Sequence, residues 1–109
     1  WFRAVGRIED DDVVHRAAIA YASDQTLLES VMRRHGIAWG TPGLRIASLD
    51  HAMWWHRPAR IDEWLLYVQE SPNATGGRGL AEGPARLAPC CDSSVITSTS
   101  WLTWYGLTR

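Results

Sequence analysis

The sequence predicts an α+β domain in which an antiparallel β-sheet packs against one long α-helix. One continuous helical pattern covers about residues 12–35, and the segments after it are short, rich in β-branched and aromatic residues, and separated by Gly and Pro. One helix followed by several antiparallel strands is typical of this class. With 109 residues, of which 46% are hydrophobic, the chain can form one core, and we expect a single domain over 1–109.

Residues 1–8 mix aromatic, β-branched and basic residues and predict a first strand. The helix expected over 12–35 has signals at both ends: the acidic run Glu9–Asp12 complements the positive end of a helix dipole, and Gly36 favours a left-handed cap after the basic last turn. Inside it, apolar residues recur at three- and four-residue spacing and predict one buried face, made of Ala17, Ala20, Leu27, Leu28 and Val31.

The rest of the chain predicts strands and turns. After a loop over 37–43, residues 44–57 look like one extended strand that Pro58 ends, and 62–70 look like its antiparallel partner. Further along we expect a turn over 71–77, a strand over 78–83, irregular structure over 84–92 and a strand over 94–105. A sheet wrapped around one long central helix is the outline of a hotdog fold.

Charge and cysteine content exclude several functional classes. Eleven basic residues stand against twelve acidic ones, so the chain lacks the excess positive charge that would attract nucleic acid or an anionic membrane. Its two cysteines, Cys90 and Cys91, are adjacent and poorly placed for a disulfide, and no apolar run is long enough to span a bilayer. We therefore expect a cytoplasmic protein, and the strand-like start at Trp1 without Met suggests a fragment of a longer chain.

Asp24 lies on the predicted apolar face of the helix. Removing a carboxylate from water costs several kcal/mol unless it is paired or has a function. The structural alternative is that Ser23 or Asp24 caps a second helical segment beginning near Gln25. The sequence leaves both interpretations open.

Ser48 interrupts the apolar strand expected over 44–57. Strict alternation would place Ser48, Asp50, Ala52, Trp54 and His56 on one face of that strand. The neighbouring pair Asp50 and His51 does not indicate a metal site, because no zinc-like spacing is present, and no Gly-x-Ser-x-Gly elbow supports a nucleophilic serine. Three tryptophans, Trp54, Trp55 and Trp64, are expected to build the core.

A glycine-rich turn surrounds Arg78 and Gly79. Such a turn can present backbone N–H groups and a guanidinium to a phosphate, although a plain turn explains these residues about as well.

Four separated blocks, in the same order and spacing over about residues 1–83, resemble the C-terminal domain of the acyl-CoA thioesterase II family; they are Tyr21–Asp24, Ala47–Pro58, Asp62–Tyr67 and Gly77–Gly79. The resemblance implies a hydrolase that converts fatty acyl-CoA to fatty acid and CoA without cofactor or metal. It also implies a double-hotdog protein of which this chain is the C-terminal half. The second hotdog domain would come from the same or another chain, and the assembly would be a homo-oligomer.

By the same resemblance, Asp24 activates the attacking water as general base and Ser48 orients it. In such a hydrolase, the CoA would reach the surface at the glycine-rich turn, where we expect Arg78 and Gly79 to bind it. The family also uses a Gln near its C-terminus, but Trp104 stands at that position here, an ungapped alignment would supply Ser98, and residues 84–109 depart from the family pattern. The alternative function is therefore a non-catalytic acyl-CoA-binding or structural half. A hotdog half also normally buries an edge and a face against its mate, so the chain alone is expected to be weakly stable.

Overall fold

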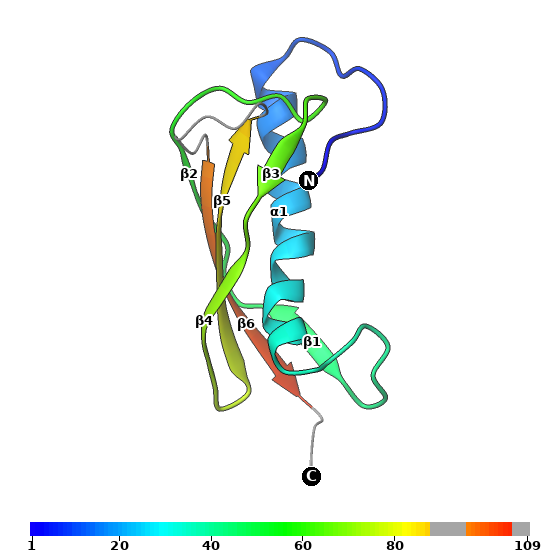
Figure 1. Ribbon diagram of the computed structural model, residues 1–109, viewed down its shortest axis with the longest axis vertical. Helices are drawn as coiled ribbons and strands as arrows, with labels where there is room; N and C mark the ends of the chain where they lie inside the picture. Colours follow the sequence, from blue (N-terminus) through cyan, green and yellow to red (C-terminus); the bar gives the residue numbers. More distant parts are fainter. Residues whose placement is uncertain (88–95, 106–109) are drawn as a thin grey trace.

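The computed structural model describes residues 1–87 and 96–105. A six-stranded antiparallel sheet curves along one side of a single long helix, which confirms the predicted hotdog fold (Figure 1). The elements in chain order are α1 (Asp12–Arg34), β1 (Arg45–Ser48), β2 (Ala52–Trp55), β3 (Leu65–Tyr67), β4 (Glu70–Thr75), β5 (Arg78–Leu87) and β6 (Ile96–Tyr105).

Both ends of α1 are capped as the sequence predicts. The Asp11 carboxylate accepts a hydrogen bond from the Val13 N–H at 2.8 Å, which satisfies one of the free donors of the first turn. At the other end Gly36 has a φ of +66°, and the Ile37 N–H bonds the Met32 carbonyl at 2.9 Å. This six-residue closure is a Schellman motif, and it turns the chain sharply toward β1.

The helix is continuous through Asp24, so the alternative in which Ser23 or Asp24 caps a second helical segment is wrong. The predicted apolar face is correct for Leu27, Leu28 and Val31, but Ala17 is exposed. The buried side of α1 is completed by His15, Ile19, Ser23 and Met32.

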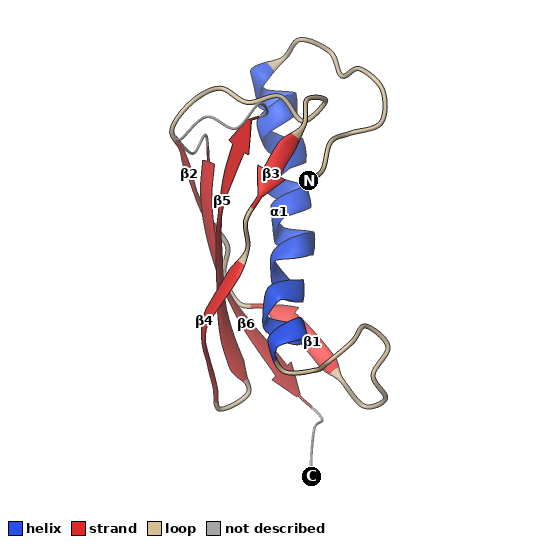
Figure 2. Cartoon of the chain, in the orientation of Figure 1, coloured by secondary structure: helices blue, strands red, loops and turns tan. Residues whose placement is uncertain are grey.

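The long strands β5 and β6 form the centre of the sheet and pair with each other over eight residue pairs. Along the outer side of β6 lie β1 and β2, and along the outer side of β5 lie β3 and β4. The expected pairing of 44–57 with 62–70 is therefore wrong. The connection after β2 crosses to the opposite edge of the sheet, as Figure 2 shows. Two of its residues, Ala59 and Ile61, are buried in the core, and their burial stabilises this path.

The single strand expected over 44–57 is also wrong, since β1 and β2 are separate. Ser48 pairs with Leu102 and Ala52 with Thr99, so three residues of the edge (49–51) face only two of β6 (100–101). One extra residue on one strand is a β-bulge, which reverses the alternation of side chains beyond it.

Four other segments differ from the predictions. Residues 1–8 form only one bridge, between Phe2 and Leu65, and Gly6 then takes a positive φ of 83° that ends the extended conformation. The strand expected over 62–70 is split into β3 and the start of β4, and β4 occupies most of the turn expected over 71–77. Strand β5 continues through Pro84 to Leu87, where irregular structure was expected, while residues 88–95 lie outside the described part of the chain.

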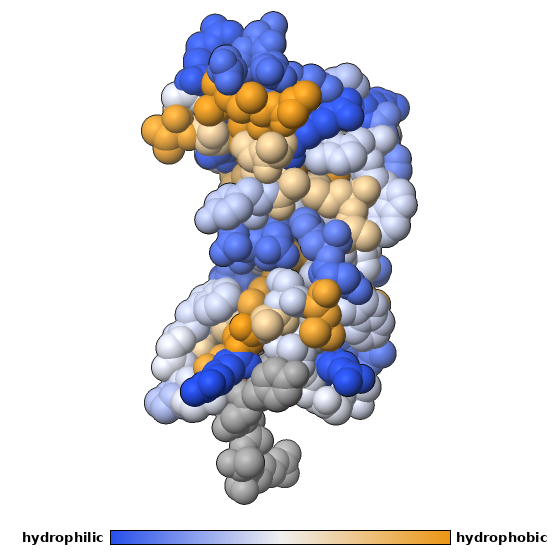
Figure 3. Space-filling view, turned by 180° about the vertical axis from the view of Figure 1, so that it is seen from behind, coloured by the Kyte–Doolittle hydropathy of each residue, from blue (hydrophilic) through white to orange (hydrophobic). Residues whose placement is uncertain are grey.

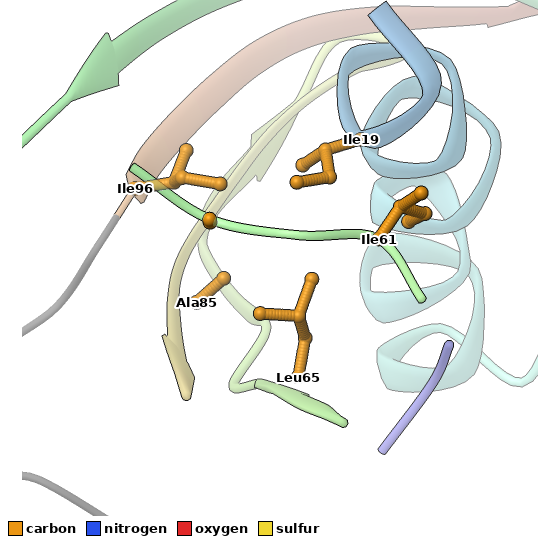
Figure 4. Packing of buried hydrophobic residues seen from close by; sticks show 6 residues of the cluster. Ile19, Ile61, Leu65, Ala85 and Ile96 are labelled. Atoms are coloured by element: carbon orange, nitrogen blue, oxygen red, sulfur yellow. The ribbon is translucent and has the colours of Figure 1, made fainter. Parts of the chain in front are cut away.

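Two apolar clusters fill the space between helix and sheet. The first contains Ile19, Ile61, Leu65, Ala85 and Ile96, whose side chains converge from the helix, the crossing connection and three strands (Figure 4). The second lies toward the C-terminal end of α1 around Leu27, Leu28, Val31 and Met32. Tyr67 contacts both clusters, and thus marks the middle of the domain.

Contrary to expectation, Trp54 and Trp64 are about half exposed, and only Trp55 packs against the core. Trp54 pairs with Thr97 and therefore lies on the sheet face away from the helix, and the Arg3 guanidinium stacks over the Trp64 ring at 4.8 Å. Seen from behind, apolar surface gathers toward the end of the molecule opposite the C-terminus, with smaller areas near the other end (Figure 3).

Candidate active site

The structure brings Asp24 and Ser48 together from opposite layers of the domain. The Ser48 hydroxyl donates a hydrogen bond to Oδ1 of Asp24 at 3.2 Å, which joins the middle of α1 to the end of β1. In this chain Asp24 is half-buried and Ser48 is exposed, so the carboxylate is less enclosed than its position on the apolar face suggested. Water can therefore reach the pair.

The pairing of β1 with β6 decides on which side of the sheet Ser48 lies. Leu102, its partner, has the same parity along β6 as the buried Ser98 and Ser100, so Ser48 is on the helix side. Met53 pairs with Ser98 and lies on that side as well. The predicted grouping of Ser48 with Ala52 and Trp54 is wrong, because the extra residue at 49–51 shifts the alternation.

Hydrogen bonds that join Asp50 and Leu49 to β6 stabilise the bulge. The Leu49 N–H donates to the Trp101 carbonyl at 2.7 Å, and the Trp101 N–H donates back to Oδ1 of Asp50 at 2.9 Å. The Ser100 hydroxyl adds a hydrogen bond to the Asp50 carbonyl at 2.5 Å. Asp50 thus holds the backbone beside Ser48, a role that its sequence neighbourhood did not reveal.

His51, the last residue of the bulge, contacts the helix. Its Nε2 lies 3.2 Å from the hydroxyl of Ser23, the residue before Asp24. That hydroxyl also lies 2.9 Å from the Ala20 carbonyl, so Ser23 hydrogen-bonds both the preceding turn of α1 and the imidazole. A second link between the bulge and α1 therefore runs beside the link from Ser48 to Asp24.

Tyr67 and Ser98 form a further polar pair in the interior. The Ser98 hydroxyl lies 2.5 Å from the Tyr67 hydroxyl, with which it shares a hydrogen bond, and 3.3 Å from the Gly83 carbonyl, to which it can donate. Burial raises the pKa of the Tyr67 phenol to about 12, and the negative charge of Asp24 acts in the same direction, although the Ser98 hydrogen bond opposes it. The phenol is therefore neutral at ordinary pH, and it interacts electrostatically with the Asp24 carboxylate.

The sequence did not predict that Tyr67, Ser23 and His51 would form polar contacts near Asp24 and Ser48. The alternation of Thr and Ser over 97–100 was a usable signal for Ser98, since every second residue of a strand faces the core. Nothing in the sequence indicated that Tyr67 would reach it, because their strands are separated by β5.

Arg78 and Gly79 lie at the start of β5, and the structure does not bring Arg78 beside Asp24. Arg78 pairs with Thr103 and faces away from the helix, whereas Gly79 is buried on the helix side. Arg78 lines an open depression on the outer face of the sheet together with Leu49, Asp50, Trp101 and Thr103. The bulge residues that follow Ser48 therefore border the same depression as Arg78.

Trp104, at the position expected to hold the family's Gln, pairs through its backbone with Ile46, and its side chain lies outside what the structure describes. Among residues 1–87 and 96–105, no cluster of three His, Cys, Asp or Glu side chains is arranged to bind a metal. In the same residues, no helix combines the length and apolar character needed to cross a membrane.

Comparison with known proteins defines the family. The sequence model of the acyl-CoA thioesterase family matches residues 1–87. Acyl-CoA thioesterase 2 of Haemophilus influenzae is 36% identical over 83 residues, and acyl-coenzyme A thioesterase 8 of Mus musculus is 43% identical over 84 residues. Each alignment covers 76% of this chain, but the chain spans only 29% and 26% of the length of these two relatives.

Solved structures agree with this assignment. An acyl-CoA thioesterase II from Mycobacterium marinum superimposes with a TM-score of 0.86 at 40% identity, over 97% of this chain and 40% of that one. A Bacillus halodurans protein at 16% identity shares the fold with a TM-score of 0.71. The domain is a thioesterase-type hotdog fold. The chain belongs to the acyl-CoA thioesterase family.

Proposed function

We propose that this chain forms part of an enzyme that hydrolyses fatty acyl-CoA to fatty acid and CoA, with Asp24 as general base and Ser48 as the group that orients the water. The observation that carries the proposal is the 3.2 Å hydrogen bond between Ser48 and Asp24, in a chain of the acyl-CoA thioesterase family. Water can reach both side chains, and the pair joins the two layers of the domain.

The geometry suits water activation. A carboxylate offers about four acceptor sites on its two oxygens, so Asp24 can accept from a water while it accepts from Ser48. The Ser48 hydroxyl can also accept from that water and fix its direction. In the reaction, the water oxygen attacks the thioester carbonyl carbon while Asp24 takes a proton; the C–S bond then breaks and the thiolate leaves with that proton.

For the CoA part, we propose that Arg78 contributes a positive charge to a phosphate. Its guanidinium faces the side of the sheet away from Asp24, but Leu49 and Asp50, which follow Ser48 directly in the chain, line the same depression as Arg78. A substrate that passes over the bulge would have its thioester at Ser48 and its phosphates near Arg78. Gly79 is buried on the other face, and its part in this proposal is limited to the backbone at the start of β5.

We also propose that a second hotdog domain, from the same or another chain, packs along β1 and β2. In the part of the chain that the structure describes, these strands pair only with β6, and their other side is unpaired. Leu49 and Trp54, which lie along this edge, are 55% and 51% exposed. Unpaired edges with exposed apolar side chains are typical of surfaces that another strand covers.

The test is thiol release from acyl-CoA by the protein that carries this chain. Asp24→Asn keeps the shape of the side chain but removes its basicity, so we expect kcat to fall by about 10²- to 10⁴-fold. Glu29→Gln, a carboxylate on the same helix that pairs with Arg33 outside the site, is the matched control and should leave kcat unchanged. Full activity of Asp24→Asn would contradict the role of Asp24.

The alternative, a non-catalytic acyl-CoA-binding half, rests on Trp104 at the expected Gln position. A thioether analogue of acyl-CoA separates the two functions because it binds but cannot be hydrolysed. Saturable binding of the analogue together with absent turnover of the thioester would favour the non-catalytic half.

A further inference from the structure

Two hydrogen bonds join neighbouring residues of α1 to the segment that contains the β-bulge. The Ser23 hydroxyl lies 3.2 Å from Nε2 of His51, and the Asp24 carboxylate accepts from the Ser48 hydroxyl at the same separation. Neighbouring residues of a helix point about 100° apart around its axis. The two bonds therefore reach α1 from different directions, and together they limit its rotation as well as its sliding along the sheet.

The bond between Ser23 and His51 is the more enclosed of the two. Ser23 is 3% exposed, and its hydroxyl also lies 3.6 Å from the Met53 sulfur on the helix side of the sheet. Ser48, in contrast, is exposed. Because water competes less for a buried hydrogen bond than for an exposed one, the contact at Ser23 fixes α1 more firmly than the contact at Asp24 does.

The sheet end of both bonds is fixed independently of the helix. Ser48 and His51 flank Leu49 and Asp50, which bond the Trp101 carbonyl and N–H at 2.7 and 2.9 Å. These bonds hold the bulge on β6, so Ser48 and His51 keep their places relative to each other. The remaining freedom is the placement of α1, and that placement depends on the contact between its Ser23 and His51.

We propose that His51 is a positioning residue for Asp24: through Ser23 it holds α1 where the Asp24 carboxylate meets Ser48 and the attacking water. This inference rests on the proposed function and adds a residue that acts on the base without contacting the substrate. A misplacement of about 1 Å at a reacting group can lower the rate by about 10²-fold. His51 therefore contributes to the rate through geometry, and its own proton is not part of the reaction.

The test measures kcat and KM for the hydrolysis of hexanoyl-CoA by the protein that carries this chain. We expect His51→Ala and Ser23→Ala each to lower kcat by about 10- to 100-fold, with a change in KM of less than about twofold, because the displaced base acts in the transition state. Both variants break the same bond, so the double variant should be no slower than the slower single one. His51→Gln has a donor and an acceptor within reach of Ser23 and should restore most of kcat.

Two control variants separate positioning from a general loss of stability. Asp62→Asn removes a carboxylate that belongs to a separate ion pair, and it should destabilise the domain while leaving kcat unchanged. His56→Ala removes an imidazole that bonds Thr97 on the outer face of the sheet, and it should change neither kcat nor KM. Ser23→Ala places a good helix former in α1, so this variant keeps the test decisive if His51→Ala folds poorly.

Additive losses in the double variant, a loss that appears in KM alone, unchanged kcat in either single variant, or an equal fall of kcat in Asp62→Asn would overturn the positioning role while leaving the proposed function in place. If the unmodified protein hydrolyses no thioester, or if Asp24→Asn stays fully active, the proposed function fails, and crystal structures of the two His51 variants decide the positioning independently. Loss of the hydrogen bond between Asp24 and Ser48 in His51→Ala, and its return in His51→Gln, supports it. An unchanged bond in His51→Ala, or a bond missing from both variants, overturns it.

Discussion

The Ser48 hydroxyl donates to Oδ1 of Asp24 over 3.2 Å, across 24 residues of sequence. This contact exists because the pairing of β1 with β6 places Ser48 on the helix side of the sheet, and because α1 continues without a break through Asp24. The two residues are the only pair among the four predicted site residues that the described structure joins by a hydrogen bond.

Replacing Ser48 tests how much the hydroxyl contributes to rate. We expect Ser48→Ala to lower kcat on acyl-CoA by about 10- to 100-fold, because the water loses one of its orienting partners while the base remains. Ser48→Thr keeps a hydroxyl at the same place and should retain most of the activity. Ser30→Ala, a serine of α1 that bonds Glu70 on the other side of the helix, serves as the control. Equal rates for Ser48→Ala and the unmodified protein would refute the orienting role.

His51 is expected to stabilise the bulge against the helix. His51→Ala removes the imidazole partner of the buried Ser23 hydroxyl, so the free energy of unfolding should fall by about 1 to 3 kcal/mol. His56→Ala removes an exposed histidine that contacts Thr97 and should change stability by no more than about 0.5 kcal/mol. Urea denaturation measures both. Indistinguishable midpoints for the two variants would show that the Ser23 contact is not stabilising.

Gly83 is expected to tolerate no side chain. A Cβ at this position would lie 2.7 Å from a ring carbon of Tyr67 and 2.7 Å from the Val68 carbonyl oxygen. The backbone carbonyl cannot rotate away, so Gly83→Ala should cost about 1 to 3 kcal/mol of unfolding free energy. Glu82→Ala, on the opposite face of β5, should be nearly neutral in the same urea titration. A stable Gly83→Ala protein would mean that β3 and β5 can separate more easily than their packing indicates.

Asp62 should make the domain sensitive to acid. Its carboxylate accepts hydrogen bonds from Arg60 and from the Ile8 N–H, each at 3.0 Å, and these hold its pKa well below the ordinary value of 3.8. A folded-state pKa below the unfolded-state value adds stability above pH 3.8, and that stability is lost as the pH falls from 3.8 through the folded-state pKa.

We therefore expect Asp62→Asn to lower Tm at pH 7 and to reduce the further fall of Tm below pH 4. Glu63→Gln, an exposed neighbour, should leave the pH profile of the unmodified protein intact. Melting curves monitored by circular dichroism across this range provide the measurement. A Tm profile of Asp62→Asn parallel to that of the unmodified protein would rule out Asp62 as the origin of the acid sensitivity.

Tyr67 should make the stability of the domain sensitive to high pH. Because its pKa in the folded state is raised to about 12 from 10.0, the unfolded chain releases this proton first as the pH rises. The associated stability is complete below pH 10 and disappears between pH 10 and 12. Compared with Tyr67→Phe, the unmodified protein should lose more stability across this interval. The difference in phenolate absorbance between the two proteins reports the same titration; a Tyr67 signal centred near pH 10 would contradict burial of its hydroxyl.

Local signals in the sequence were sufficient for α1. The acidic start, the glycine at the end and the three- and four-residue spacing of apolar residues each depend on neighbours within one or two turns, and they placed both ends correctly. The strands were harder because their limits depend on partners far along the chain. Residues 71–75 have the composition of a turn, yet they belong to β4, and 73–75 pair with β5 across the short connection at Gly76 and Gly77.

The sequence by itself determined the fold class, the long helix, the family, and Asp24 and Ser48 as the residues to examine. Only the tertiary structure decided that these two side chains meet, that Arg78 faces the other side of the sheet, and that Tyr67, Ser98, Ser23 and His51 gather nearby. The physical reason is that these relationships depend on strand pairing; one extra residue at 49–51, for example, reverses the side-chain directions of β2 relative to β1. Such a bulge is stabilised by hydrogen bonds to Ser100 and Trp101, about fifty positions away, which no local pattern records.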